Sequence, residues 1–395
     1  MSNTLISSLS PSATFVMAQK SIELIAAGVD VVNMSLGEPD YPTPDHIKQA
    51  AEMAIRENYT RYSPVSGFSS LRDVVCSKLL RENCLSYKRE EILISSGAKQ
   101  SICNAIMAII NDGNEVIIPA PYWVSYPQMV KLAGGVPVFI ETGIEHNYKT
   151  TAKQLEDTIT SKTRMIILCS PCNPSGSVYS KDELIELSKV ILQHKDLFVL
   201  SDEVYEHLNY VGQHYSIASL PGMKERTILV NGVSKAYSMT GWRIGFIAAP
   251  REIVSACNIL QGQYTSGPCS ISQKAAEAAW NGPQECVEEM RLAFQRRRDL
   301  LVSLMREIPG LEVNVPEGAF YLFPKCSSYF GKTNGERIIR TSSDLATYLL
   351  EFGHVATVGG DAFGAPDCIR LSYATSEDNI KEAAKRIKEA LTSLK

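Results

Sequence analysis

The sequence has no apolar run that approaches the ~18 consecutive residues needed to cross a bilayer. Its N-terminal stretch, MSNTLISSLSPSATF, lacks the basic start and the apolar core of a signal peptide. Neither sign of charge is in excess, because 39 basic and 43 acidic side chains leave a net charge of -4. The basic run at 296–298 lies in a helical pattern that carries both signs of charge, which is typical of a solvated helix face. We therefore expect a cytoplasmic protein that binds neither membranes nor nucleic acid.

Complete metal-binding and nucleotide-binding motifs are also lacking. Cys169 and Cys172 form a C-x-x-C, which is typical of a redox pair or of half a zinc site. No second C-x-x-C or closely spaced histidine pair completes four ligands, so we expect no metal site, and the redox pair stays an open alternative. GGDAFG at 359–364 lacks the middle glycine of G-x-G-x-x-G, and FGKT at 330–333 follows Cys326 where a P-loop needs glycine. An enzyme that binds NAD or ATP is therefore disfavoured.

No internal repeat, low-complexity tract or long linker divides the chain, so its organisation rests on the order of the expected elements. The apolar runs expected to be strands lie at 92–95, 115–118, 136–141, 164–169, 197–201, 227–230 and 244–248. Helical patterns at 69–83, 99–110 and 181–193 lie between them. Continuous apolar strands separated by helices predict an α/β fold with a parallel sheet covered on both faces.

After residue 283 the pattern changes. A long charged helix at 285–307 precedes alternating runs at 311–315 and 319–323, and helices follow near 344–352 and 377–394. This mixture predicts a separate, smaller α+β domain. A chain of 395 residues is also too long for one domain of ordinary size, so two domains are expected.

The stretch VNGVSKAYSMTGWRIG at 230–245 contains the residues most suggestive of chemistry. Lys235 lies in a loop directly after an expected strand, and a buried, unpaired ammonium is unfavourable unless it loses its charge. A lysine that can lose its charge is a nucleophile for carbonyl groups. Arg243 follows in the same stretch, and its planar fork suits a phosphate. Together they suggest pyridoxal phosphate (PLP), although a surface loop with two ordinary cations remains an alternative.

Polar residues follow other expected strands as well. SSGAKQ lies between a strand and a helix, where Gly97, Ala98 and Lys99 offer free N–H groups and the positive end of a helix to a phosphate. Asn173 and Asp202 each follow a strand, and a buried carboxylate such as Asp202 would suit a protonated ring nitrogen. Each site has an ordinary alternative, namely a strand-to-helix turn, a turn-forming asparagine and a helix N-cap.

Two further residues suit a flat ring and an anion. Trp123, in PAPYWVSYP, would stack on a ring or simply belong to the core. Arg370, in the otherwise apolar CIRLSY, needs a structural salt bridge or an anionic ligand such as an α-carboxylate. Ligands of open α/β sheets bind at the carboxyl ends of the strands. The shared edge of Asn173, Asp202 and Lys235 therefore favours a common ligand over three separate explanations.

The stretch S-K-A-Y-S-M-T-G-W-R-I-G resembles the cofactor-lysine motif of the class I/II aminotransferases, which are fold-type I PLP enzymes, and specifically that of bacterial aspartate aminotransferases of the Ib subgroup. The similarity extends from PSAT near the N-terminus to IRLSYATS near the C-terminus. It implies a large PLP-binding domain at 46–283, with a mostly parallel central sheet between helices. It also implies a smaller α+β domain built from both chain ends, at 1–45 and 284–395.

The resemblance also implies a role for each candidate. Lys235 would form the Schiff base with PLP and then move the proton, while Asp202 would pair with the ring nitrogen and Tyr205 would contact the ring hydroxyl. The groups expected around the rest of the cofactor are Gly97, Ala98, Lys99, Trp123, Asn173, Ser234 and Arg243. The groups expected to bind the substrate are Thr14, Gly37, Lys99, Trp123, Asn173 and Arg370. Tyr62, in RYSPVSG, is similar to the tyrosine that reaches the phosphate of the neighbouring subunit, which implies a homodimer with active sites at the interface.

Substrate specificity depends on fewer residues. In the Ib subgroup a lysine at the Lys99 position and a threonine at the Thr14 position hold the distal carboxylate, which implies a ping-pong reaction of L-aspartate and 2-oxoglutarate to oxaloacetate and L-glutamate. Two positions depart from related patterns. Ser10 stands where relatives that also accept prephenate carry a basic residue, which argues against that activity. Gly232 stands where other subgroups place a phosphate-binding serine, and Ser234 is the nearby candidate to replace it.

Rival functions remain within the same chemistry. Another transaminase, acting on aromatic amino acids or prephenate, and a PLP-dependent carbon–sulfur lyase are the nearest alternatives. A lyase would release pyruvate and leave the aldehyde form of the cofactor intact. Related PLP-sensing transcription regulators carry an N-terminal DNA-binding domain, for which a PSAT motif that begins at residue 11 leaves no room, so that class is not expected.

Overall fold

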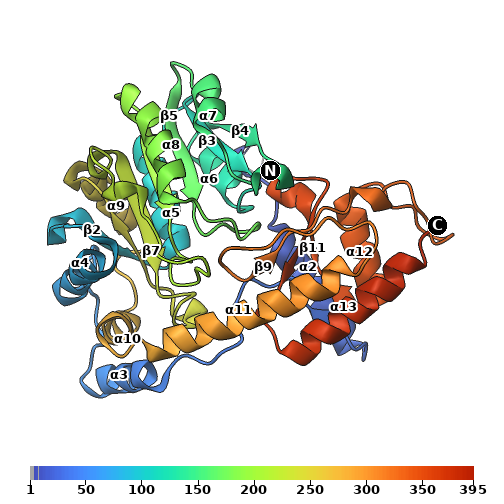
Figure 1. The fold of residues 1–395 in the computed structure, drawn as a ribbon. Coiled ribbons are helices and arrows are strands. Elements are labelled where there is room, and N and C mark those ends of the chain that lie inside the picture. Colours follow the sequence, from blue (N-terminus) through green and yellow to red (C-terminus); the bar gives the residue numbers. More distant parts are fainter. Residues whose placement is uncertain (1–3, 8) are drawn as a thin grey trace.

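The computed structural model describes residues 4–7 and 9–395 and is built around a seven-stranded sheet in the order β2-β8-β7-β6-β5-β3-β4 (Figure 1). The strands are β2 (Ile92–Ser95), β3 (Glu115–Ala120), β4 (Val136–Glu141), β5 (Thr163–Cys169), β6 (Phe198–Asp202), β7 (Thr227–Gly232) and β8 (Gly245–Ala248). Four of the six pairings between neighbours are parallel. The predicted α/β class with a mostly parallel central sheet is confirmed.

Strand β8 departs from the parallel pattern, because it runs antiparallel to both β2 and β7. The connection from β7 to β8 contains no α-helix, only the loop that carries Lys235 and a 3-10 turn at Thr240–Trp242. A connection without a crossover helix joins antiparallel neighbours, whereas parallel neighbours need a longer crossover. The Lys235 loop is therefore anchored at both ends by strands that pair with each other.

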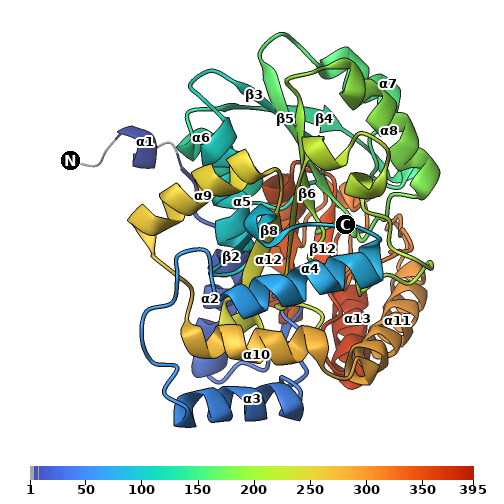
Figure 2. The same ribbon diagram turned by 90° about the vertical axis from the view of Figure 1, so that its left-hand side faces the viewer.

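Helices cover both faces of this sheet. One face carries α5 (Ala98–Ile109), α6 (Tyr126–Leu132) and α9 (Arg251–Tyr264). The other face carries α7 (Ala152–Thr158) and α8 (Lys181–Gln193) at one end and α4 (Ser69–Asn83) and α10 (Ser270–Asn281) at the other, with α3 (Asp45–Arg56) beside α10 (Figure 2). Alternate strand residues face opposite sides, so that Ile166 and Ile167 of β5 belong to different apolar clusters.

The remaining elements form a smaller α+β part. β1 (Val32–Asn33) pairs in parallel with β10 (Val355–Ala356), and β11 (Val358–Gly359), β12 (Ile369–Ser372) and β9 (Tyr321–Leu322) form an antiparallel sheet in that order. Its helices are α2 (Ala13–Ala26), α11 (Glu285–Arg306), α12 (Ser342–Gly353) and α13 (Glu377–Thr392), whereas the short α1 (Thr4–Ser7) lies apart from them, on the side of α6 (Figure 2). The alternating run at 311–315 forms a single bridge, from Glu312 to Lys325, rather than a strand.

The pairing of β1 with β10 supports the prediction that both chain ends build one domain. Helix α11 extends from beside α10 to α13 and so connects the two parts of the chain (Figure 1). The boundaries at 45/46 and 283/284 remain a prediction. In the described part of the chain, no helix combines the length and apolar character that a membrane span requires.

A buried ionic network lies behind the segment that follows β6. The side chain of Lys78 is 1% exposed and forms an ion pair with Glu206, which is 5% exposed. Asn83 and Asn231 donate to the two oxygens of Glu206 at 2.8 and 2.6 Å. Burial acts to raise the pKa of Glu206, but Lys78, the two histidines His207 and His214 and the hydrogen bond from Asn83 together lower that pKa well below its ordinary value. The network therefore connects α4 to β7 and to the segment after β6.

Removal of one member of this pair should destabilise the fold. Lys78→Met would leave Glu206 charged, buried and unpaired, which typically lowers the free energy of unfolding by about 3–5 kcal/mol. Lys153→Met is the matched control, because Lys153 forms an ion pair with Asp157 but both side chains are more than half exposed. Its effect should stay within about 1 kcal/mol. Urea unfolding of both variants measures the difference, and equal losses would contradict a stabilising role for the network.

Candidate active site

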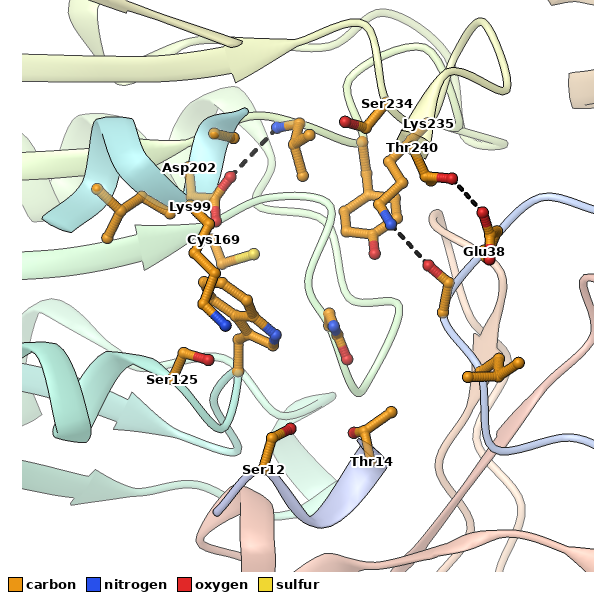
Figure 3. Close-up of a pocket in the computed structure, with 18 of the residues that line it drawn as sticks. Ser12, Thr14, Glu38, Lys99, Ser125, Cys169, Asp202, Ser234, Lys235 and Thr240 are labelled. Atoms are coloured by element: carbon orange, nitrogen blue, oxygen red, sulfur yellow. Dashed lines mark hydrogen bonds between the residues drawn. The ribbon is translucent and has the colours of Figure 1, made fainter. Parts of the chain in front are cut away.

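A cavity of about 530 Å³ opens at the carboxyl ends of β3, β5, β6 and β7, where open α/β sheets bind ligands (Figure 3). Its opposite wall comes from the start of α2, residues 36–38, β9 and β12. The predicted site residues that line it are Thr14, Gly37, Ala98, Lys99, Trp123, Asn173, Asp202, Tyr205, Ser234, Lys235, Arg243 and Arg370. Residues from eight different parts of the sequence thus meet around one space.

Lys235 extends into this cavity from the loop after β7, and its ammonium donates to the carbonyl of Gly37 at 2.6 Å (Figure 3). Burial lowers the pKa of Lys235 from 10.5 to about 8; Glu38 opposes this shift, and the charges of Arg370 and Arg243 add to it. No described carboxylate forms an ion pair with Lys235. A lysine in these surroundings is partly neutral near physiological pH and can attack a carbonyl group.

Asp202 is the last residue of β6, and its carboxylate accepts hydrogen bonds from two other residues. The hydroxyl of Tyr126 donates to its Oδ2 at 2.6 Å, and the backbone N–H of Val204 donates to Oδ1 at 3.4 Å. Burial raises the pKa of Asp202 from 3.8 to about 6, while these two hydrogen bonds act in the opposite direction. Asp202 is not a helix N-cap, because residues 204–207 form turns. The carboxylate is instead available to a cationic group in the cavity.

One end of the cavity is suited to a dianion. Helix α5 begins at Ala98 after Gly97, which has a φ of 86° and supplies no side-chain cap, so the first N–H groups of the helix stay free. The guanidinium of Arg243 lies against Gly97 and donates to the carbonyls of Thr240 and Ser96 at 2.8 and 3.4 Å. A Cβ at Gly97 would meet Arg243 Nη2 at 2.3 Å, so only glycine fits.

Lys99 adds a second cation near this end, with its ammonium 5.3 Å from the ring centre of Trp123. Burial, followed by repulsion from Arg243, lowers the pKa of Lys99. In the described structure, neither Lys99 nor Arg243 forms an ion pair with a carboxylate. Two unpaired cations beside a free helix N-terminus favour a bound phosphate or carboxylate.

Arg370 is the charged group at the opposite wall, on β12, and is 2% exposed. It donates to Asn173 Oδ1 at 2.9 Å and to the carbonyl of Ser35 at 2.5 Å, and its Nε has no partner. The guanidinium also lies 4.6 Å from the ring centre of Tyr321. A structural salt bridge was the alternative for Arg370, but no carboxylate among the described residues pairs with it. A buried guanidinium of this kind requires an anionic ligand.

Tyr205 lies between these two ends. Its hydroxyl shares a hydrogen bond of 2.7 Å with the hydroxyl of Tyr321, and burial raises its pKa well above the ordinary value. Tyr321 also packs on Gly37, where an added Cβ would lie 2.2 Å from the Tyr321 hydroxyl. Asn173, whose alternative role was turn formation, uses its side-chain oxygen to orient Arg370.

Comparison with known proteins identifies the family. The model of "Aminotransferase class I and II" matches residues 29–387. This chain belongs to the class I and II aminotransferases.

The relatives carry more specific names. "Bifunctional aspartate aminotransferase and glutamate/aspartate-prephenate aminotransferase" of Petunia hybrida is 48% identical over 395 residues, which cover 99% of this chain and 82% of that protein. "Aspartate/prephenate aminotransferase" of Nitrosomonas europaea is 46% identical over 391 residues, 98% of each chain. The solved aspartate aminotransferase of Rhizobium meliloti superposes with a TM-score of 0.96 at 44% identity and full coverage of both chains. The expected aminotransferase activity and fold are thus confirmed.

Among the residues singled out in the sequence, Gly97 directly precedes the lining residue Ala98 without itself lining the aminotransferase cavity, and Tyr62, Ser10 and Gly232 lie outside it. Tyr62 is 99% exposed on the molecular surface. Ser10 is exposed, and its backbone N–H donates to Gln128 Oε1 at 3.2 Å. Gly232 lies inside the β7–β8 pair, where an added Cβ would meet the Ile244 carbonyl at 2.8 Å. Strand packing therefore excludes a serine at Gly232, while Ser234 lines the cavity.

The sequence reading missed several residues of this aminotransferase site. Tyr126 supports Asp202, and Tyr321 supports both Tyr205 and Arg370. Glu38, next to Gly37, accepts a hydrogen bond from Thr240 and lines the cavity (Figure 3). Both tyrosines lie in apolar and aromatic stretches of sequence that predict only a buried core position. Their roles in the site can be recognised only from hydrogen-bond partners that are distant in sequence.

The depressed pKa of Lys235 predicts its reactivity in the cofactor-free protein. Its neutral form should accumulate as the pH rises through about 8, whereas an exposed lysine ionises near 10.5. Acylation of Lys235, followed by peptide mass spectrometry from pH 6 to 11, should therefore reach half its maximum rate near 8. Lys153 is a suitable internal reference, because its ion pair with Asp157 raises its pKa. Identical profiles for the two lysines would contradict the assignment.

Proposed function

We propose that this chain is a PLP-dependent aminotransferase that moves the amino group of L-aspartate to 2-oxoglutarate, giving oxaloacetate and L-glutamate by a ping-pong reaction. The observation that carries the proposal is one cavity in which Lys235, with its lowered pKa, faces the buried and unpaired Arg370. The first group suits a carbonyl and the second suits a carboxylate. An amino-acid transaminase needs both.

The cavity fits PLP at each of its functional groups. The N-terminus of α5 with Lys99, Ser234 and Arg243 would hold the phosphate, and Asp202 would pair with the ring nitrogen. Trp123 would stack on the ring, and Asn173 and Tyr205 would reach its hydroxyl. PLP, when bound, supplies an aldehyde that condenses with amines and a ring that draws electrons away from the substrate Cα.

Lys235 would serve as nucleophile and proton carrier. Its nitrogen donates to the Gly37 carbonyl and lines the same cavity as Arg370, so it would meet a substrate held at Arg370. In its neutral form the nitrogen would act as the base that takes the proton from the substrate Cα and later gives it up again. The lowered pKa supports this role, because a fully charged ammonium accepts no proton.

The substrate would be held at both of its carboxylates. Arg370, with Asn173 and the backbone of Gly37, would bind the α-carboxylate, since the guanidinium lacks an anionic partner. Lys99, in the first turn of α5, and Thr14, at the start of α2, line the same cavity, where a distal carboxylate would meet them (Figure 3). Charge at both ends favours dicarboxylic substrates over monocarboxylic ones.

Prephenate is a second candidate substrate, because several relatives are named aspartate/prephenate aminotransferases. Ser10 argued against it, but Ser10 is exposed and outside the cavity lining, so its side chain is a weak guide. Prephenate also carries two carboxylates, which Arg370 and Lys99 would suit. An aromatic transaminase or a carbon–sulfur lyase has no comparable support from the cationic groups at the two ends.

A homodimer completes the proposal. Tyr62 is an aromatic residue with almost no contact in its own chain, and Tyr264 and Ile259 are also largely exposed. We infer that Tyr62 enters the neighbouring subunit, where its hydroxyl would contact the cofactor phosphate. The mass of the protein in solution tests this part, and a stable monomer with full activity would contradict it.

The proposed reaction is tested by separating its two halves. PLP is added to the purified protein, and absorbance is recorded before and after L-aspartate, with no oxo acid present. We expect the band of the lysine-bound cofactor to convert to the amine form, and 2-oxoglutarate to restore it. Prephenate in place of 2-oxoglutarate tests the second substrate. Pyruvate release with an unchanged aldehyde band would instead indicate a lyase.

Arg370→Gln should separate substrate binding from cofactor binding. Loss of a buried, bidentate charge pair typically costs about 2–5 kcal/mol, so kcat/KM for aspartate should fall by roughly 30-fold or more. PLP affinity should stay within about twofold, since Arg370 lies at the opposite wall from the phosphate end. Arg337→Gln, which removes an exposed pair with Glu351, is the control. An unchanged KM for aspartate would place the carboxylate site elsewhere.

A further inference from the structure

Tyr126 is a buried residue that the proposed reaction does not yet use. It begins α6, is 1% exposed, and its ring meets Trp123 edge to face at a centroid distance of 5.4 Å. Its hydroxyl donates to Asp202 Oδ2 at 2.6 Å, a length typical of a hydroxyl bonded to an ionised carboxylate. The packing around the ring therefore fixes the position of the donor, and the donor fixes the carboxylate.

The two oxygens of Asp202 have different surroundings. Oδ2 accepts the short bond from Tyr126, whereas Oδ1 accepts only a long bond of 3.4 Å from the Val204 N–H among the described residues. A carboxylate oxygen has two lone-pair sites, so Oδ1 retains capacity for a further donor. Asp202 also lines the cavity. The arrangement leaves one oxygen occupied and the other ready to accept a hydrogen bond from a ligand.

We propose that Tyr126 is a positioning residue for Asp202: its hydroxyl occupies Oδ2, so that Oδ1 is oriented and free for the protonated ring nitrogen of the cofactor. This inference rests on the proposed function and deepens it, because it names the group that prepares Asp202 for the cofactor. In this role the hydroxyl of Tyr126 acts through Asp202, while its ring is part of the cavity lining.

The chemistry explains why such a donor is needed. Asp202 is buried, and burial favours its neutral form, which would offer a proton to the ring nitrogen rather than accept one. The hydrogen bond from Tyr126 favours the ionised form. Tyr126 can serve only as a donor here, because an ionised carboxylate has no proton to give. Without the hydroxyl, Asp202 would rotate more freely and bind protons more readily.

The test compares Tyr126→Phe with wild type in cofactor-free protein titrated with PLP. The Tyr126–Asp202 bond is present without the cofactor, so its loss should weaken PLP binding through the charge and orientation of Asp202; a shift of one unit in the pKa of Asp202 corresponds to about a 10-fold change, and the PLP dissociation constant should rise by about that factor. The increase should be larger at pH 6 than at pH 9, since Asp202 without its donor remains protonated to higher pH. In turnover, kcat should fall while KM for aspartate stays within about twofold.

Tyr179→Phe is the matched control. Tyr179 is similarly buried, lines the same small cavity as Tyr126, and accepts a hydrogen bond from the Thr150 N–H at 2.9 Å. It does not contact Asp202. Both variants should lower the melting temperature, but only Tyr126→Phe should change PLP affinity. Equal affinities in wild type and Tyr126→Phe would overturn the inference.

A double mutant separates this inference from the proposed function. Asp202→Asn should weaken PLP binding, and Tyr126→Phe added to it should have little further effect. If Asp202→Asn alone leaves PLP binding unchanged, the proposed role of Asp202 is wrong. If Tyr126→Phe weakens binding equally in both backgrounds, Tyr126 acts through packing and the inference fails.

A variant that keeps both the ring and the hydroxyl provides a test that does not depend on whether Tyr126→Phe folds correctly. Replacement of Tyr126 by 3-fluorotyrosine strengthens the hydroxyl as a donor and leaves the packing almost unaltered. PLP affinity at pH 6 should then be equal to or higher than that of wild type, opposite in direction to Tyr126→Phe. A lower affinity would count against the inference.

Discussion

The site depends on cations without carboxylate partners, of which Arg370 is buried and Lys235 is partly buried, whereas Lys99 and Arg243 are exposed. Lys235 and Arg370 are enclosed on opposite walls of one cavity, and Lys99 and Arg243 lie near the start of α5. Among the described side chains none of the four forms an ion pair. Burial of an unpaired charge lowers the free energy of unfolding, so packing interactions elsewhere in the protein must compensate for this cost. The same absence of internal anions leaves the cavity able to bind phosphate and carboxylate groups from solution.

The segment 34–43 joins the two walls. Met34 and Ser35 bond to β12 through the Ser372 N–H and the Arg370 side chain, and Gly37 accepts from Lys235. Further along, Thr43 bonds to the carbonyl of Ser238 in the Lys235 loop. A short, irregular stretch thus carries hydrogen bonds to both the small sheet and the loop that contains Lys235. It therefore helps to fix the positions of Arg370 and Lys235 relative to each other.

Much of the site was predictable because its residues follow strands that apolar periodicity marks clearly. Asn173, Asp202 and Lys235 fall at strand ends whose shared edge follows from the α/β order alone. The antiparallel direction of β8 was not predictable in this way, since it depends on a loop without a helix. Tyr126 and Tyr321 were missed because their partners, Asp202 and Tyr205, are distant in sequence and leave no local pattern. The short strands β1, β10 and β11 are defined by pairing rather than by composition.

The hydrogen bond from Lys235 to the Gly37 carbonyl has a thermodynamic consequence. Any ligand that bonds covalently to the lysine nitrogen removes protons from it and competes with that contact. In the proposed PLP enzyme, part of the intrinsic affinity for the cofactor would be offset by the loss of this one contact with the 34–43 segment, on the order of 1–3 kcal/mol for a hydrogen bond from a charged donor. The cofactor-free and loaded proteins should consequently differ in the mobility of this segment, although it lies outside the cofactor-binding sheet itself.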